Sequence, residues 1–118
     1  MAELAHFIAV DIGASSGRVI LGRWDGSQMA LTELHRFPNG MVERGGHLFW
    51  DINRLWHEVQ HGLRQYAQTE HAALLASIGI DTWAVDYALL DERGVLIGDP
   101  FAYRDPRNEG IAEQVDQI

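Results

Sequence analysis

With 118 residues, the chain is long enough for one small domain with a core but not for two, and its 47% hydrophobic and 22% charged residues are typical of a globular protein. The formal net charge of −8 argues against nucleic acid or an anionic membrane surface as a partner. The chain has no cysteine, no apolar run near the ~18 residues of a membrane span and no signal-peptide pattern, so we expect a soluble, cytoplasmic protein without disulfides.

The N-terminal half predicts antiparallel strands followed by one helix. Apolar runs separated by turn residues predict strands at residues 7–12, 18–24 and 28–37, and a small hairpin within residues 41–50. Asp51 is a plausible helix N-cap. Apolar residues recur after it at helical spacing to about residue 68, namely Ile52, Leu55, Trp56, Val59, Leu63, Tyr66 and Ala67.

The C-terminal half predicts two further strands, a hairpin and a closing helix. Residues 74–80 are apolar on both sides, which indicates a fully buried strand, and residues 84–90 form a second apolar run with one acid inside it. A tight turn then leads into residues 95–97, which complete a hairpin. Asp105 and Pro106 fit the N-cap and first position of a helix, whose apolar residues are Ile111, Val115 and Ile118.

The turn between the first two strands is suited to hold a phosphate. Small residues and two hydroxyls allow backbone N–H groups to approach an anion at Gly13, Ala14, Ser15, Ser16, Gly17 and Arg18. A P-loop and a dinucleotide fingerprint both require a helix directly after the turn, whereas a strand follows here and the chain has no lysine. Asp11 makes most sense as a carboxylate that holds Mg²⁺ through bound water. An ordinary hairpin turn is the alternative.

The expected helix also contains the pattern of a zinc hydrolase. His57, Glu58 and His61 match H-E-x-x-H, in which two histidines one turn apart bind zinc. At helical spacing, however, the two histidines lie roughly opposite the apolar stripe and beside Arg54 and Arg64. We therefore interpret them as part of a solvated face.

A second group of polar residues follows the apolar strands. Asp81 and Asp86 need partners or a site, because burying an unpaired charge is costly, and Trp83 lies between them. The loop that carries Asp105 and Arg107 adds a carboxylate and a guanidinium near the exit of a strand. Such groups with an aromatic wall suit a sugar or polyol. A structural Asp–Arg pair with a helix cap is the alternative.

Three stretches of the chain resemble the rhamnulokinases of the FGGY carbohydrate kinase family. They are residues 10–18 (VDIGASSGR), 79–87 (GIDTWAVDY) and 103–107 (YRDPR). The resemblance spans essentially the whole chain, and it implies an α/β, actin-like and ribonuclease-H-like fold with a mixed sheet that begins with three antiparallel strands and is flanked by helices. It also implies transfer of the γ-phosphate of ATP, with Mg²⁺, to the 1-hydroxyl of L-rhamnulose or a related ketose.

The resemblance also assigns roles by position. Asp11 would help to hold the metal, and residues 13–18 would meet the nucleotide phosphates. The residues expected to face the sugar or lie near it are Trp83, Ala84, Asp86, Asp105 and Arg107. Ala84 departs from the glycine that is usual in rhamnulokinases, and its extra methyl group would tighten or shift the sugar pocket.

Family members are several times longer than this chain. Their general base and adenosine-binding half would lie beyond Ile118, so we expect residues 1–118 to be the N-terminal part of the first domain and to be inactive alone. Exposed apolar surface at the missing half would favour self-association. The alternative function is a non-catalytic actin-like module that binds nucleotides or a protein partner.

Overall fold

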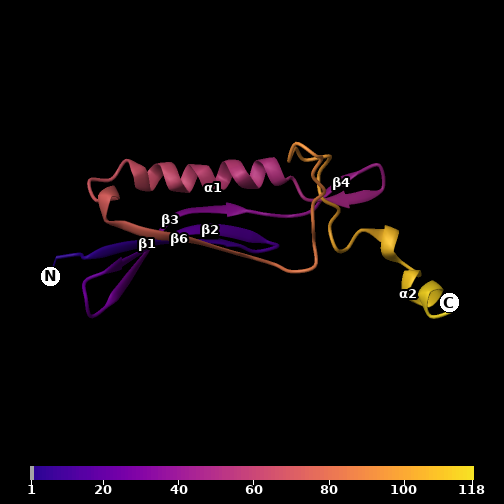
Figure 1. Ribbon diagram of the computed structural model, residues 1–118, viewed down its shortest axis with the longest axis horizontal. Helices are drawn as coiled ribbons and strands as arrows, with labels where there is room; N and C mark the ends of the chain where they lie inside the picture. The colour runs from indigo at the N-terminus through magenta and orange to yellow at the C-terminus, as the bar shows by residue number, and fades with distance from the viewer. Residues whose placement is uncertain (1) are drawn as a thin grey trace. The chain divides into compact units, whose positions relative to one another are not determined.

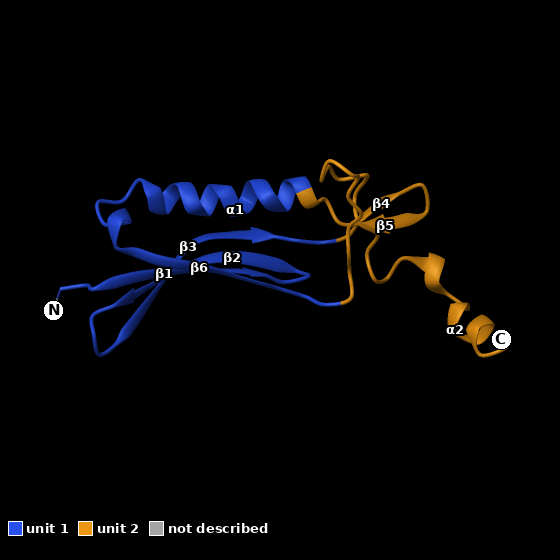
Figure 2. Ribbon diagram, viewed as in Figure 1, with its two compact units in different colours: residues 1–40, 53–84 blue, residues 41–52, 85–118 orange. Residues whose placement is uncertain are grey.

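The computed structural model describes residues 2–118, which form two compact units (Figures 1 and 2). Unit 1 comprises residues 1–40 and 53–84, and unit 2 comprises residues 41–52 and 85–118. The chain crosses between the units more than once, so each unit is built from segments distant in sequence.

Unit 1 is built on a four-stranded mixed sheet. Its strands lie in the order β3-β2-β1-β6, with bounds β1 (Ala5–Ile12), β2 (Ser16–Trp24), β3 (Met29–Pro38) and β6 (Leu75–Thr82). β1 pairs with β2 and β2 with β3 in antiparallel fashion, whereas β6 pairs with β1 in parallel. The three antiparallel strands that open the chain confirm the sequence prediction.

The helix α1 (Ile52–Ala67) covers one face of this sheet (Figure 1). Alternate residues of β1 and β2 point to that face, because successive side chains of a strand lie on opposite sides. The core that they form with the helix consists of Ile8, Val10, Val19, Leu21, Val59 and Tyr66. The helix approaches the sheet closely at Gly62, where an added Cβ would lie 2.5 Å from Cγ2 of Val19. Trp56, expected on the buried side, is 53% exposed.

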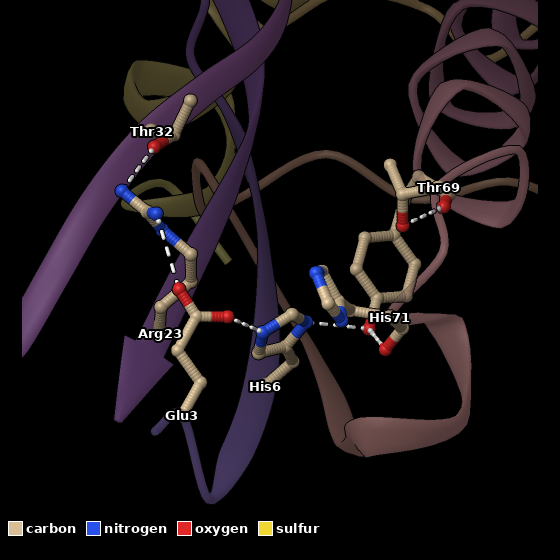
Figure 3. Close-up of polar contacts among 7 residues, drawn as sticks. Glu3, His6, Arg23, Thr32, Thr69 and His71 are labelled. Atoms are coloured by element: carbon tan, nitrogen blue, oxygen red, sulfur yellow. Dashed lines mark hydrogen bonds and ion pairs between the residues drawn. The ribbon is translucent and has the colours of Figure 1, made fainter. Parts of the chain in front are cut away.

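A buried histidine connects β1 to the end of α1 (Figure 3). His6 is 2% exposed, and its Nδ1 lies 2.8 Å from the hydroxyl of Tyr66 while its Nε2 lies 2.7 Å from Oε2 of Glu3. The Tyr66 hydroxyl donates to the backbone carbonyl of His71 at 3.1 Å. Since a carboxylate only accepts, Nε2 of His6 donates the bond to Glu3. The network therefore fastens the N-terminal segment to the helix.

The burial predicted for residues 74–80 is wrong for the described chain. β6 is a strand as expected, but Ile78 is 47% and Ile80 is 65% exposed. β6 is an edge strand of the four-stranded sheet, and it is Leu75, at its start, that packs against the core. The sequence of β6 is as apolar as that of an interior strand. Within residues 2–118, however, no element covers its exposed apolar side chains.

Unit 2 consists of a small hairpin, loops and two short helices. The expected hairpin is confirmed as β4 (Val42–Arg44) and β5 (His47–Phe49), with Gly45 and Gly46 at φ values of 59° and 82° in its turn. The helices are η2 (Pro106–Asn108) and α2 (Ile111–Val115). Gly110, at φ 76°, separates them, so the expected closing helix is broken in two.

The strand predicted at residues 84–90 does not form. An isolated bridge between Leu90 and Leu96 remains of the predicted hairpin. β6 ends at Thr82, and Val85 has a φ of 72°, which is outside the extended region. The apolar composition predicted a strand here, but composition does not show that one residue has a backbone conformation incompatible with a strand.

Within residues 2–118, none of the helices combines the length and the apolar composition needed to cross a membrane.

Candidate functional site

The turn between β1 and β2 is held by its own backbone. The N–H of Gly13 donates to the carbonyl of Ser16 at 2.9 Å. A Cβ on Gly13 would lie 2.8 Å from that carbonyl oxygen, and a Cβ on Gly17 would lie 2.2 Å from Cζ of Phe37. Turn closure and packing therefore already require both glycines, whether or not an anion approaches them.

Asn39 fastens this turn from the end of β3, a role that the sequence did not reveal. Its backbone N–H donates to the carbonyl of Ser15 at 3.0 Å, and its Nδ2 donates to the carbonyl of Gly13 at 2.9 Å. In the sequence, Pro38-Asn39-Gly40 indicated only the end of a strand. The pairing of β2 with β3, Ser16 with Pro38, brings Asn39 to the turn.

Asp11, Ser16 and Arg18 form a polar cluster at the same turn. Asp11 and Arg18 are partners in the β1–β2 register, and Nη1 of Arg18 donates to Oδ2 of Asp11 at 2.7 Å. Nη2 of Arg18 donates to the carbonyl and the hydroxyl oxygens of Ser16 at 3.0 and 3.1 Å. The Asp11 side chain is 41% exposed, whereas the buried Nε of Arg18 has no hydrogen-bond partner within residues 2–118. The cluster presents a carboxylate and a guanidinium side by side.

A second carboxylate lies on the neighbouring strand. Asp81 of β6 pairs in register with Asp11 of β1, so both point to the same face of the sheet, opposite the face that α1 covers. Mg²⁺ keeps several of its waters and takes one or two carboxylates from the protein. Within residues 2–118 there is no group of three or more candidate metal ligands. The oxygen donors at Asp11 and Asp81 fit a water-mediated magnesium ion and not a fully protein-bound metal.

In unit 2, Asp86 is held by a buried tryptophan. Nε1 of Trp50, which is 1% exposed, donates to Oδ2 of Asp86 at 2.6 Å. The rings of Trp50 and Tyr103 lie with their centroids 6.4 Å apart. The sequence singled out Asp86 but not Trp50, which lies 36 residues earlier in the chain.

Asp105 is the buried cap of η2 and also binds β5. Its carboxylate accepts from the N–H of Arg107 at 3.1 Å and from the N–H of Leu48 at 2.7 Å, and Nδ1 of His47 lies 3.2 Å from each oxygen. Burial acts to raise the pKa of Asp105, but the hydrogen bonds from Leu48, His47 and Arg107 outweigh it and lower the pKa below its ordinary value. The N-cap prediction is confirmed, and a contact of Asp105 with sugar stays a prediction.

Arg107 lies against aromatic rings. Its guanidinium carbon is 4.0 Å from the ring centroid of Phe101, which lies 4.6 Å from that of Phe49. The guanidinium carbon of Arg44 is 4.9 Å from the Phe49 centroid. The stack gives Arg107 a fixed place beside Asp105 through cation–π contacts.

The structure groups the predicted sugar residues by unit. Asp86, Asp105 and Arg107 belong to unit 2, whereas half-buried Trp83 and exposed Ala84 end unit 1, directly after β6. Asp105 and Arg107 are adjacent, and Asp86 is joined to Trp50.

The histidines of the zinc pattern lie on the exposed side of α1, as expected. His57 and His61 are both exposed, although the ring of His61 also lies 4.4 Å from that of His35 on β3. Oε2 of Glu58, the base of such a site, is 2.5 Å from Nε2 of His35. These contacts join the helix to the sheet and do not build a zinc site.

The chain is similar in sequence to several rhamnulokinases. It is 48% identical over 118 residues to that of Enterobacter sp., 47% identical over 108 residues to that of Bacteroides thetaiotaomicron and 44% identical over 114 residues to that of Mannheimia succiniciproducens. These alignments cover 98%, 92% and 95% of the chain. The chain matches the N-terminal segment of the rhamnulokinases. No family model matches it.

This rhamnulokinase-like segment spans less than a quarter of its relatives. It covers 24% of the Enterobacter protein, 22% of the Bacteroides protein and 23% of the Mannheimia protein. Solved structures of sugar kinases share its fold. It superposes on the xylulose kinase from Rhodospirillum rubrum with a TM-score of 0.71 at 21% identity, over 96% of this chain and 23% of that chain.

A carbohydrate kinase from Novosphingobium aromaticivorans gives a TM-score of 0.73 at 21% identity, over 99% of this chain and 23% of that chain. At this identity the likeness shows the fold. The rhamnulokinase-like segment therefore has the actin-like, ribonuclease-H-like fold expected from its sequence and represents part of a domain.

Proposed function

We propose that this chain is the N-terminal segment of an ATP- and Mg²⁺-dependent kinase that phosphorylates L-rhamnulose at its 1-hydroxyl. The observation that carries the proposal is the 48% identity to the Enterobacter rhamnulokinase over 98% of the chain. The aligned region contains both groups of expected site residues: the β1–β2 turn, expected to bind phosphates, and the segment around Asp86, expected to bind the sugar. We place the whole protein in the cytoplasm.

The β1–β2 turn would bind the nucleotide phosphates. Asp11 would hold Mg²⁺ through water, and the ion, when bound, neutralises charge that develops on the transferred phosphoryl group. Residues 13–17 would offer backbone N–H groups and hydroxyls to the phosphates. Arg18 is already at the turn, where its guanidinium now balances Asp11 at 2.7 Å and could also contact a phosphate oxygen.

The segment after β6 would bind the sugar. The Asp86 carboxylate would accept a hydrogen bond from a sugar hydroxyl, and Trp83 would contact the apolar side of the sugar. Ala84 would lie along the sugar through its backbone. Asp105 contacts Leu48, and Arg107 contacts Phe101, so both side chains have fixed positions in the loop that carries them. We assign Asp105 and Arg107 to the edge of the sugar site.

Residues 1–118 alone would not catalyse phosphoryl transfer. The reaction depends on positioning both substrates and on stabilising charge at the transferred group. The chain covers 22–24% of the rhamnulokinases it matches, and we expect the general base and the adenosine-binding half to lie in the remainder.

A chimera tests this proposal. The 118-residue chain replaces the aligned segment of the Enterobacter sp. rhamnulokinase, and L-rhamnulose-dependent ADP formation is measured. We expect the chimera to form ADP only when L-rhamnulose is present. Asp11→Ala in the chimera should lower kcat about a hundredfold or more, because it removes the group that orients the metal.

The parent Enterobacter protein and the isolated chain serve as controls. L-rhamnulose-dependent ADP formation by the isolated chain would contradict the expectation that it is inactive. A folded chimera that phosphorylates another ketose but not L-rhamnulose would overturn the choice of sugar. A folded chimera that binds Mg·ATP and phosphorylates no sugar would overturn the kinase proposal and support the nucleotide-binding module.

A further inference from the structure

Trp50 is a fixed hydrogen-bond donor inside unit 2. Its backbone N–H donates to the carbonyl of Pro100 at 2.9 Å, and the N–H of Ala102 donates to the carbonyl of Leu48 at 2.8 Å. An antiparallel bridge between Phe49 and Phe101 lies between these two bonds. The segment that carries Trp50 is thus fastened to residues 100–102 on both sides. Because the side chain is 1% exposed, its indole N–H has little freedom to turn to water.

That donor is directed at Asp86. The distance of 2.6 Å from Nε1 of Trp50 to Oδ2 of Asp86 is short for an N–H donor and is typical of a bond to a charged acceptor. A buried indole N–H requires an acceptor, so the contact satisfies Trp50. It equally fixes the plane and position of a carboxylate whose residue is only half-buried.

The backbone next to Asp86 is strained. Val85 has a φ of 72°, a conformation that is rare and sterically unfavourable for a β-branched residue. The Val85 side chain is 78% exposed, so its own packing does not compensate for that strain. Strain of this kind persists where neighbouring contacts impose it, and it is frequent at binding sites. The bond from Trp50 to the adjacent residue is such a contact.

We infer that Trp50 is a positioning residue for the sugar site: its fixed indole N–H helps to hold the Asp86 carboxylate in the orientation that accepts a hydrogen bond from a hydroxyl of the sugar. This inference rests on the proposed function, which places Asp86 at the sugar. Trp50 acts through Asp86 and has no contact with the sugar in this assignment. Its loss weakens sugar binding because it removes one contact that orders the carboxylate before the sugar binds.

The test compares the KM values of chimera variants for the two substrates, L-rhamnulose and ATP. Trp50→Phe keeps most of the buried ring and removes the donor, and we expect it to raise KM for L-rhamnulose about tenfold or more, the effect of one hydrogen bond to a charged group. The KM for ATP should not change. Asp86→Ala should raise KM for L-rhamnulose at least as much. Trp56→Phe is the matched control, because Trp56 is 53% exposed on α1 and lies in unit 1.

A general loss of structure would not produce this pattern, since it would lower activity without selecting one substrate. A second measurement avoids the catalytic assay: the indole N–H resonance of Trp50 in the isolated chain should move upfield in the Asp86→Ala variant. An unmoved resonance would overturn the hydrogen bond and with it the inference.

Two further outcomes separate the inference from the proposed function. If Asp86→Ala raises KM for L-rhamnulose and Trp50→Phe does not, the positioning role is wrong and the kinase assignment stands. If the unmodified chimera is folded and shows no sugar-dependent ADP formation, the proposed function fails, and the inference fails with it.

Discussion

Val85 combines a β-branched side chain with a left-handed backbone conformation. The direction in which a Val85→Gly substitution changes the free energy of unfolding, relative to the same substitution elsewhere, can therefore be predicted. Glycine adopts a φ of 72° without steric cost, whereas valine does not. We expect Val85→Gly to be about 1 kcal/mol more favourable to folding than the same change at Val95, which is 57% exposed and has no positive φ. Urea denaturation of both variants measures the difference. Equal losses at the two positions would contradict the strain.

Asp105 predicts how unit 2 responds to acid. The pKa of its carboxyl is lowered from 3.8, so it contributes stability that is present above that value and is lost as the pH falls through the lower pKa of the folded protein. We expect the urea midpoint to fall as the pH is lowered below about 3.8, and Asp105→Asn to remove this part of the fall.

The His47→Ala variant provides the matched comparison for Asp105. His47 donates to the Asp105 carboxylate at 3.2 Å and helps to lower its pKa. Without His47 the pKa should lie closer to the ordinary value, so the acid-induced loss of stability that Asp105 causes should be smaller than in the wild type. If Asp105→Asn loses stability below pH 3.8 as steeply as the wild type, the assignment of the acid loss to Asp105 is wrong.

Among the elements, the contact of α1 with β2 is the most sensitive to volume. A Cβ on Gly62 would lie 2.5 and 2.7 Å from Cγ2 and Cβ of Val19, so Gly62→Ala overpacks the core. Overpacking costs about 1–3 kcal/mol, and the better helix propensity of alanine returns up to ~1 kcal/mol. We therefore expect a net destabilisation of about 1–2 kcal/mol in urea denaturation.

Gly79 on β6 is the control for that substitution. A Cβ there would have no atom within 4 Å, and its φ is not positive, so Gly79→Ala should change the free energy of unfolding by less than about 0.5 kcal/mol. If Gly62→Ala is as well tolerated as Gly79→Ala, the helix does not approach the sheet as closely as the structure shows.

The elements that could be predicted from the sequence are those whose pattern is local. β1, β2, β3, the β4–β5 hairpin and α1 follow from periodicity and from glycine turns, which act over a few residues. The strand predicted at residues 84–90 failed because the apolar run does not reveal the positive φ of Val85. The burial of β6 failed because burial depends on what covers a strand, which its own residues do not specify.

In the candidate site, too, the contacts between residues close in sequence were predicted and those between distant residues were not. Asp11, Ser16 and Arg18 form one cluster as their shared turn predicted, since they are close in sequence. Asn39 and Trp50 were missed because the residues they hold, Gly13 and Asp86, are 26 and 36 residues away. Their side chains match common structural roles, a turn and a core aromatic, so only the sheet register and the fold identify their partners.

At the scale of the whole molecule, β6 is an edge strand of the sheet and carries exposed apolar side chains. Ile78 and Ile80 lie beside Ile8 and Val10 in the register of β1 and β6, yet they are 47% and 65% exposed. An edge strand with exposed apolar residues is a template for pairing with another chain. The chain covers only 22–24% of the rhamnulokinases that it matches, so in a longer protein other segments are available to cover this edge.

We therefore predict that the isolated chain self-associates through β6. Ile80→Thr keeps a β-branched residue in the strand but makes its exposed surface polar, and it should weaken self-association about tenfold in sedimentation equilibrium, as the loss of one buried isoleucine contact implies. Leu31→Thr is the matched control, because Leu31 is 70% exposed on β3, the opposite edge strand of the same sheet. It should leave association unchanged if β6 is the contact. A wild-type chain that stays monomeric at high concentration would contradict the predicted self-association. Equal effects of Ile80→Thr and Leu31→Thr would show that β6 is not the contact.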